Sequence, residues 1–231
     1  LMYSNFGDFY LWRDEMHKGT LADFTTKDFV LGAPNKKVKL YNVYITYKST
    51  EAIVDAVQKL RYAVNGTGNF INFAACTIDG AAVSDLPTTF TALKLGGTAV
   101  LTVGTTTAAH ANNHIETDLS GVSEIEVGDF ISIAGDNNEY MKVTDTTYAN
   151  QLGVVRAHPI GGVIDATSND SAITVLKWKQ ARFSITSTVD SETRNGVVCD
   201  SVQVRFRPGG ATSFMIQSII FEYRPLFKET T

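Results

Sequence analysis

A two-residue alternation of apolar and polar side chains runs through most of this chain and limits what it can fold into. In KLYNVYITYKS, one set of alternating positions consists of Tyr41, Val43, Ile45 and Tyr47. The same period recurs in ARFSITS and in SVQVRFRPGG. Successive side chains of a strand point to opposite faces of a sheet, so this pattern predicts half-buried strands. Half-buried strands are typical of antiparallel sheets. The sequence therefore predicts an all-β fold, an antiparallel β-sandwich that is jelly-roll-like.

Turn residues bound the remaining strand signals. A strand is expected near Asp23–Leu31, and the strand RYAV is followed by Asn65-Gly66, a pair that tolerates the positive φ angles of a tight reversal. The segment SFMIQSIIFEYRP is apolar at successive positions, which predicts a central strand covered on both faces and ended by Pro225. Only Ser49–Lys59 favours a short helix, and a bulged strand or a loop is the alternative there.

The composition changes in the middle of the chain. Residues 96–170 are rich in Thr, Ala, Gly, Asn and Asp, and the strand-like pieces TAVLTVGT, EIEVGDFISIAG, EYMKVTDT and QLGVVRAH are separated by polar turns. Short, closely spaced strands are typical of a small β-barrel or hairpin unit. We expect 96–170 to be a small β-domain inserted into a sandwich formed by 19–95 and 171–228. Residues 1–18 are expected to be an N-terminal segment, with the end of an upstream element as one interpretation. The chain opens at Leu1 without an initiator methionine, which is interpreted as a fragment of a longer polypeptide or as a maturation product.

Length and composition exclude several classes of protein. The chain has 231 residues, of which 44% are hydrophobic and 19% charged, and these values are ordinary for a globular protein. A net charge of −4 gives no basic field for phosphates, so nucleic acid is not an expected partner. No apolar run approaches the ~20 residues that span a bilayer, so membrane insertion is not expected. Cys76 and Cys199 are expected to be free, buried thiols of a protein folded in the reducing cytoplasm.

No residue pattern points to catalysis or to metal binding. His110 and His114 have HxxxH spacing, but they lack a helix signal and the glutamate of a metalloprotease motif, so a solvated loop is expected. The oxygen-rich 136–139 is interpreted as a polar hairpin tip, with a weak calcium site as the alternative. Glu124 and Glu126 would share one solvated face of a strand, with a glycosidase-type pair as the alternative. We therefore expect no catalytic, metal-binding or cofactor-binding residues, no cofactor and no enzyme activity.

Aromatic side chains are the better candidates for contacts. Trp12, Tyr148 and Trp178 lie near the ends of expected elements, where an aromatic ring could stack on a sugar or on a neighbouring subunit. Packing in the core is the alternative for each of them. These three residues are the candidate contacts to a partner or to a glycan.

Two stretches resemble modules of bacteriophage virion proteins. The segment EIEVGDFISIAGDNNEYMKVTDTTYANQLGVVRAHPIGG resembles a unit that is common in phage tail and virion proteins. The matching positions are Val127, Gly128, Asp129, Ile131, Ile133, Glu139, Met141, Val143, Thr144, Leu152, Val154, Val155 and Arg156. The usual Arg-Gly is replaced by Arg156-Ala157. The segment from Trp12 to Ser49 is similar to the link between an upstream β-propeller and a terminal sandwich in podophage-type tail proteins, with Gly32-Ala33-Pro34 as its Gly-x-Pro turn.

The resemblance implies a function without catalysis. It implies a structural protein of a bacteriophage virion, a tail component that assembles with copies of itself and with neighbouring tail proteins. The alternative is a carbohydrate-binding module of a tail protein that recognises a host surface glycan. A glycan binder should show a shallow groove with an aromatic floor on a single chain, whereas an assembly protein should bury that surface between subunits. A third hypothesis, a tail depolymerase, requires a cleft with two close carboxylates.

Overall fold

The computed structural model describes residues 2–5, 8–11, 24–32, 36–92, 114–116, 124–133, 140–147, 151–155, 173–189, 192–207 and 214–226. Every strand pairing in this part is antiparallel, and its one α-helix is the single turn α1 (Ala56–Lys59). The predicted all-β, antiparallel fold is thereby confirmed, and the jelly-roll-like topology stays a prediction. Contacts divide the chain into two units, with boundaries between Thr88 and Thr89 and between Lys177 and Trp178.

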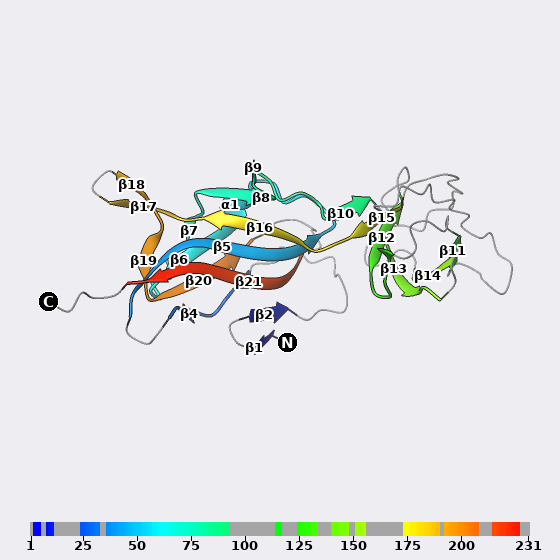
Figure 1. Ribbon diagram of the computed structural model, residues 1–231, viewed down its shortest axis with the longest axis horizontal. Coiled ribbons are helices and arrows are strands. Elements are labelled where there is room, and N and C mark those ends of the chain that lie inside the picture. The colour runs from blue at the N-terminus through cyan, green and yellow to red at the C-terminus, as the bar shows by residue number, and fades with distance from the viewer. Residues whose placement is uncertain are drawn as a thin grey trace. The chain divides into compact units, whose positions relative to one another are not determined.

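The first unit contains a sheet organised around one long strand, which we call the front sheet. Its strands are β5 (Val38–Ser49), β8 (Ala75–Ile78), β9 (Ala81–Val83), β16 (Lys179–Ser184), β19 (Val197–Cys199) and β21 (Phe214–Pro225). One edge of β5 pairs with β21 along its length. The other edge pairs with β16 and then with β19, and β8 and β9 continue the sheet beyond β16 (Figure 1).

A second sheet of the same unit, the back sheet, lies behind β5 and β16 in the view of Figure 1. It consists of β3 (Phe24–Thr25), β4 (Phe29–Val30), β6 (Leu60–Val64), β7 (Ile71–Asn72) and β20 (Ser201–Phe206). The predicted reversal after β6 is confirmed, because Asn65 and Gly66 have φ angles of 55° and 62°. Two hairpins complete this unit: β1 (Met2–Asn5) with β2 (Asp8–Leu11), and β17 (Thr186–Val189) with β18 (Glu192–Asn195).

One hydrophobic core joins the front and back sheets. The alternation predicted for ARFSITS and SVQVRF is confirmed, since every second residue from Ala181 to Ile185 and from Val202 to Phe206 is buried. Three aromatic rings cross from one sheet to the other. The ring centroids of Tyr62 and Phe73 are 5.1 Å apart, and those of Phe73 and Phe183 are 5.0 Å apart. Such tilted ring pairs add to the stabilisation that comes from area burial alone.

The second unit is one antiparallel sheet with its own core. Its strand order is β10 (Phe90–Ala92), β15 (Ile173–Leu176), β12 (Phe130–Ile133), β13 (Tyr140–Asp145), β14 (Gln151–Val155) and β11 (His114–Glu116). Its buried residues are Ile125, Ile131, Met141, Val143, Leu152, Val154, Ile173 and Val175. The strands expected in EIEVGDFISIAG, EYMKVTDT and QLGVVRAH are therefore present as β12, β13 and β14. The strand expected in TAVLTVGT lies outside the described residues.

A hydrogen-bonded turn leads into β12. Gly128, at a φ of 94°, donates its backbone N–H to Val143, and Asp129 Oδ2 accepts hydrogen bonds from the backbone N–H of Glu126 (3.0 Å) and from Lys177 Nζ (2.9 Å). Lys177 Nζ also donates to the carbonyl of Glu124. Asp129 thus ties the turn to the residue that follows β15.

Replacing Asp129 by alanine is expected to destabilise the second unit by about 1–3 kcal/mol, because the Glu126 backbone N–H loses its acceptor and the Lys177 ammonium loses one of its two acceptors. Hydrogen exchange of β12 and β13 amides measures this loss within the unit. The control is Glu126→Ala in the same turn, whose exposed side chain should change stability by no more than about 0.5 kcal/mol. Equal exchange rates in the two variants would contradict the role given to Asp129.

Two local predictions need correction. Strand β21 is not a central strand covered on both faces: among the described strands it forms a ladder with β5 alone, and Ile219 is its one buried residue. Its end at Pro225 is as predicted. Glu124 and Glu126 lie in the turn before β12 and not on a strand, so the expected shared strand face does not exist. In Ser49–Lys59, only the last four residues are helical.

No helix among the described residues is long and apolar enough to cross a membrane.

Candidate functional site

A β-bulge in β5 shapes the outer face of the front sheet. Along β21, Glu222 pairs with Asn42 and the next residue, Tyr223, pairs with Leu40, so Tyr41 is an extra residue without a partner. On the opposite edge β16 ends opposite Asn42 and β19 begins opposite Leu40, and between them the Tyr41 carbonyl accepts a hydrogen bond from the Ile185 backbone N–H. A bulge bends the strand and redirects side chains. Val43, Ile45 and Tyr47 face the core. Because of the bulge, Tyr41 does not continue this series of inward-facing residues and is only partly buried.

Glu222 is held in place by two donors on β5. Its Oε2 accepts hydrogen bonds from Asn42 Nδ2 at 2.7 Å and from the Tyr44 hydroxyl at 2.8 Å. The hydrogen bond from Tyr44, followed by the one from Asn42, holds the pKa of the Glu222 carboxyl below its usual value. The same hydrogen bond raises the pKa of the Tyr44 hydroxyl. Both shifts favour a charged carboxylate beside a neutral phenol at neutral pH.

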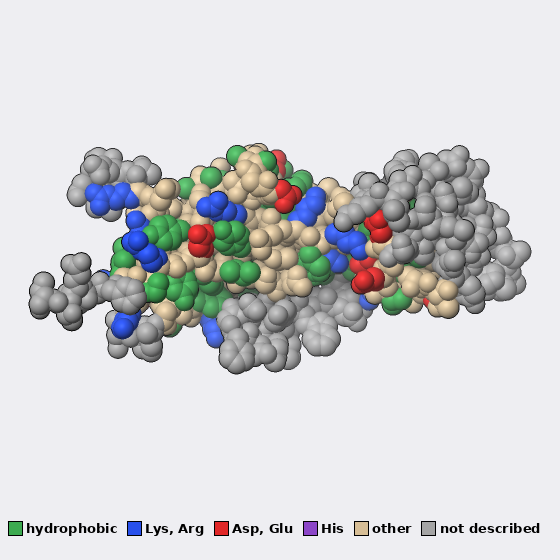
Figure 2. Space-filling view, in the orientation of Figure 1, with side chains coloured by type: hydrophobic (Ala, Val, Ile, Leu, Met, Phe, Trp, Pro, Cys, Tyr) green, Lys and Arg blue, Asp and Glu red, His purple; other side chains and the backbone are tan. Residues whose placement is uncertain are grey.

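Arg182 on β16 lies opposite Tyr44 and extends this polar cluster. Its charge also lowers the pKa of Glu222, yet no hydrogen bond or ion pair joins its guanidinium to another described residue. Figure 2 views the molecule from this side, where basic, acidic and hydrophobic side chains lie next to one another over the front sheet. The donor groups of Arg182 are therefore available to a ligand.

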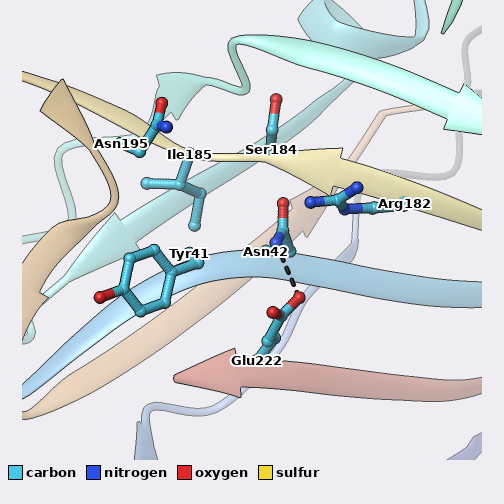
Figure 3. A pocket seen from close by; sticks show the side chains of 7 residues that line it. All are labelled: Tyr41, Asn42, Arg182, Ser184, Ile185, Asn195 and Glu222. Atoms are coloured by element: carbon cyan, nitrogen blue, oxygen red, sulfur yellow. Dashed lines mark hydrogen bonds between the residues drawn. The ribbon is translucent and has the colours of Figure 1, made fainter. Parts of the chain in front are cut away.

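Between these side chains lies a shallow hollow of about 250 Å³, which we call the bulge hollow (Figure 3). It is lined by Tyr41, Asn42, Arg182, Ser184, Ile185, Asn195 and Glu222. Three elements contribute besides β5: strand β16, hairpin strand β18 with Asn195, and strand β21 with Glu222. In Figure 3 the second oxygen of Glu222 points to the Tyr41 side of the cluster. The hollow thus offers a carboxylate acceptor, guanidinium and amide donors, and one aromatic ring.

The residues predicted as contacts are not those that line the bulge hollow. Trp178 is 40% exposed and carries Lys48 Nζ 4.9 Å from its ring centroid, but it is not part of the lining. Trp12 and Tyr148 lie outside the described residues, as do His110 and 136–139. His114 belongs to strand β11, so the loop expected for it is wrong, and its side chain is not described. The contact roles of Trp12, Tyr148 and Trp178 stay predictions.

The two cysteines are separate, buried thiols. Cys76 and Cys199 are buried and free, as predicted. Burial raises the pKa of the Cys76 thiol to about 12 and that of the Cys199 thiol to about 11, so both stay protonated. Among the described residues, no group of three or more His, Cys, Asp or Glu side chains could hold a metal ion.

Sequence reasoning missed the bulge hollow, although the chain contains a signal for it. Buried positions alternate as Val38 and Leu40 and then as Val43, Ile45 and Tyr47, so the two-residue period slips by one between Leu40 and Val43. A slip of this kind indicates a bulge. It could have identified Tyr41 as redirected, but the convergence of Arg182, Glu222 and Asn195 depends on strand order.

Comparisons with known proteins give this chain no relative from which a role could be transferred. No family model matches it, and no curated protein or solved structure matches it either.

Proposed function

We propose that this chain is a non-enzymatic structural protein of a bacteriophage virion, a tail component that works by oligomeric assembly with copies of itself and with neighbouring tail proteins. The proposal rests on the resemblance of two segments to phage tail modules. It places the mature protein in the virion after folding in the bacterial cytoplasm.

The observation that carries the proposal is the place of the resembling residues in the second unit. The apolar positions of that motif, among them Ile131, Met141 and Val154, form the buried core of this unit. Its Gly-Asp pair forms the hydrogen-bonded turn into β12. The motif therefore specifies a scaffold, which is what an assembly module needs. A motif that specified a reaction would instead place polar side chains in a cleft.

Oligomeric state tests this function directly. Sedimentation velocity of the full chain over about 1–100 μM should give one defined mass, a whole multiple of the chain mass, because closed rings have a fixed copy number. Negative-stain images should show the matching rotational axis. In phage particles that contain the chain, immunogold labelling should mark the tail. A chain that stays monomeric at every concentration, or labelling confined to the head, would contradict the proposal.

The bulge hollow favours a second candidate function, carbohydrate recognition by a tail protein. It is lined by Tyr41 together with polar and charged side chains, among them Arg182 and Glu222. This is the geometry expected of a glycan binder. The two functions are compatible if the assembled subunits leave the outer face of the front sheet open.

A further inference from the structure

The geometry points to the bulge hollow as a binding site for one ring of a neutral saccharide, with Glu222 and Arg182 as the residues that bind its hydroxyl groups. This inference rests on the second candidate function and names the ligand chemistry and the contact residues for it. It does not depend on whether the chain assembles into a ring.

The charges of the lining select the class of ligand. Glu222 presents a carboxylate whose Oε1 has no hydrogen-bond partner among the described residues, and Arg182 presents donors that are likewise not used by them. A ligand with a single charge would be attracted by one of these two side chains and repelled by the other, so the lining favours neither sign of charge. A hydroxyl group is both donor and acceptor, so neighbouring hydroxyls can donate to the carboxylate and accept from the guanidinium.

The acceptor is preorganised. Because Asn42 and Tyr44 both donate to Oε2, the orientation of the Glu222 carboxylate is fixed before a ligand arrives. Strand β5 supplies both donors and strand β21 supplies the acceptor, so the group is held by paired strands and not by a loop. A group that is already ordered loses little conformational entropy on binding, which favours affinity at a small site.

Size and apolar surface fit a single ring. The volume of about 250 Å³ is just below the roughly 300–1,000 Å³ of pockets for drug-sized ligands. The Tyr41 ring gives the hollow apolar surface beside its polar groups, whereas Ile185 is buried in the core. Gly196 lies so close to the Tyr41 ring that a Cβ added to this glycine would be 3.0 Å from Tyr41 Cδ1. The backbone of Gly196 therefore limits where the ring can lie. A tyrosine ring that is held in one place can pack against the C–H face of a sugar.

Saturation-transfer NMR on the full chain tests the site with methyl α-D-glucopyranoside, methyl α-D-galactopyranoside and methyl α-D-mannopyranoside. At least one of these glycosides should receive saturation, with an affinity of about 1 mM as expected for a shallow site. Glu222→Gln and Arg182→Ala should each weaken binding about tenfold or more, because each removes a hydrogen bond to a charged group. Circular dichroism spectra and melting temperatures should match those of the unmodified chain.

Gln180→Ala is the matched control. Gln180 is an exposed residue of the same strand, β16, two positions before Arg182, and it does not line the hollow. Its replacement should leave glycoside binding unchanged. Inorganic phosphate is the competing probe, and it should not displace the glycoside.

Each other result overturns the inference. The inference fails if none of the glycosides receives saturation at about 50 mM, well above a millimolar dissociation constant. It fails equally if Glu222→Gln and Arg182→Ala bind as well as Gln180→Ala, or if phosphate displaces the glycoside. A failure here leaves the sedimentation result untouched, so the assembly function and the saccharide site are judged separately.

Discussion

Replacing Phe183 by alanine is expected to lower the free energy of unfolding of the first unit by about 3–5 kcal/mol, the usual cost of truncating a buried phenylalanine. Phe183 is 0% exposed, and its ring contacts Phe73, which in turn contacts Tyr62 of the back sheet. Removal of the ring leaves a cavity between the two sheets, and close-packed strands on both sides cannot move together to fill it. Urea unfolding followed by tryptophan fluorescence measures the loss.

The control for this variant is Gln180→Ala, three positions earlier on the same strand. Gln180 is exposed on the outer face, so its loss should change stability by no more than about 0.5 kcal/mol. The slope of free energy against urea should stay the same in both variants, since neither changes the area exposed on unfolding appreciably. A loss below about 1 kcal/mol for Phe183→Ala would show that the ring does not join the two sheets.

Replacing Gly196 by alanine is expected to cost about 2–4 kcal/mol and to disturb the bulge hollow, for two separate reasons. Gly196 has a φ of 83°, a conformation that costs an L-residue about 1–2 kcal/mol. In addition, its new Cβ would lie 2.7 Å from the carbonyl oxygen of Leu40 and 3.0 Å from Tyr41 Cδ1. Tyr41 must therefore move. Thermal unfolding gives the cost, and amide chemical shifts of Tyr41 and Asn42 report the movement.

Gly80→Ala separates the two causes. Gly80 has nearly the same φ, 81°, but nothing lies within 4 Å of the Cβ that alanine would add. Its replacement should show only the conformational cost of about 1–2 kcal/mol and leave the shifts of Tyr41 and Asn42 unchanged. If Gly196→Ala were no worse than Gly80→Ala, close packing of Gly196 against β5 would not matter for this site.

The sequence predicted strands well wherever one face is buried. In β16 and β20 each apolar residue is buried and each polar residue except Ser201 is at least partly exposed, so the period of two identifies both the strand and its inward face. Strand β21 misled because its apolar residues continue without alternation, as in SIIF. Composition alone cannot distinguish a strand covered on both faces from a strand at the edge of a sheet. That distinction depends on which strands pair, and pairing is a long-range property.

The bulge hollow was out of reach for the same reason. Its charged residues, Arg182 and Glu222, are 40 positions apart in the chain, and both are far from Asn42. They meet only because β5 pairs with β16 on one edge and with β21 on the other. Tyr41 could be recognised from the local sequence, because the two-residue alternation is interrupted between Leu40 and Val43. The local sequence contains no such signal for Arg182 and Glu222.

The pairing of β10 with β15 has a consequence for how the chain tolerates change. Phe90 and Leu176 are direct partners in this ladder, so the chain enters and leaves the second unit about 5 Å apart, one strand spacing. The segment between Phe90 and Leu176 can change in length or sequence without changing the distance between these two residues. The first unit, which is connected to both of them, would then need no adjustment. Natural variants of this protein are therefore expected to differ most in length between these two residues, with little change in the two flanking sheets.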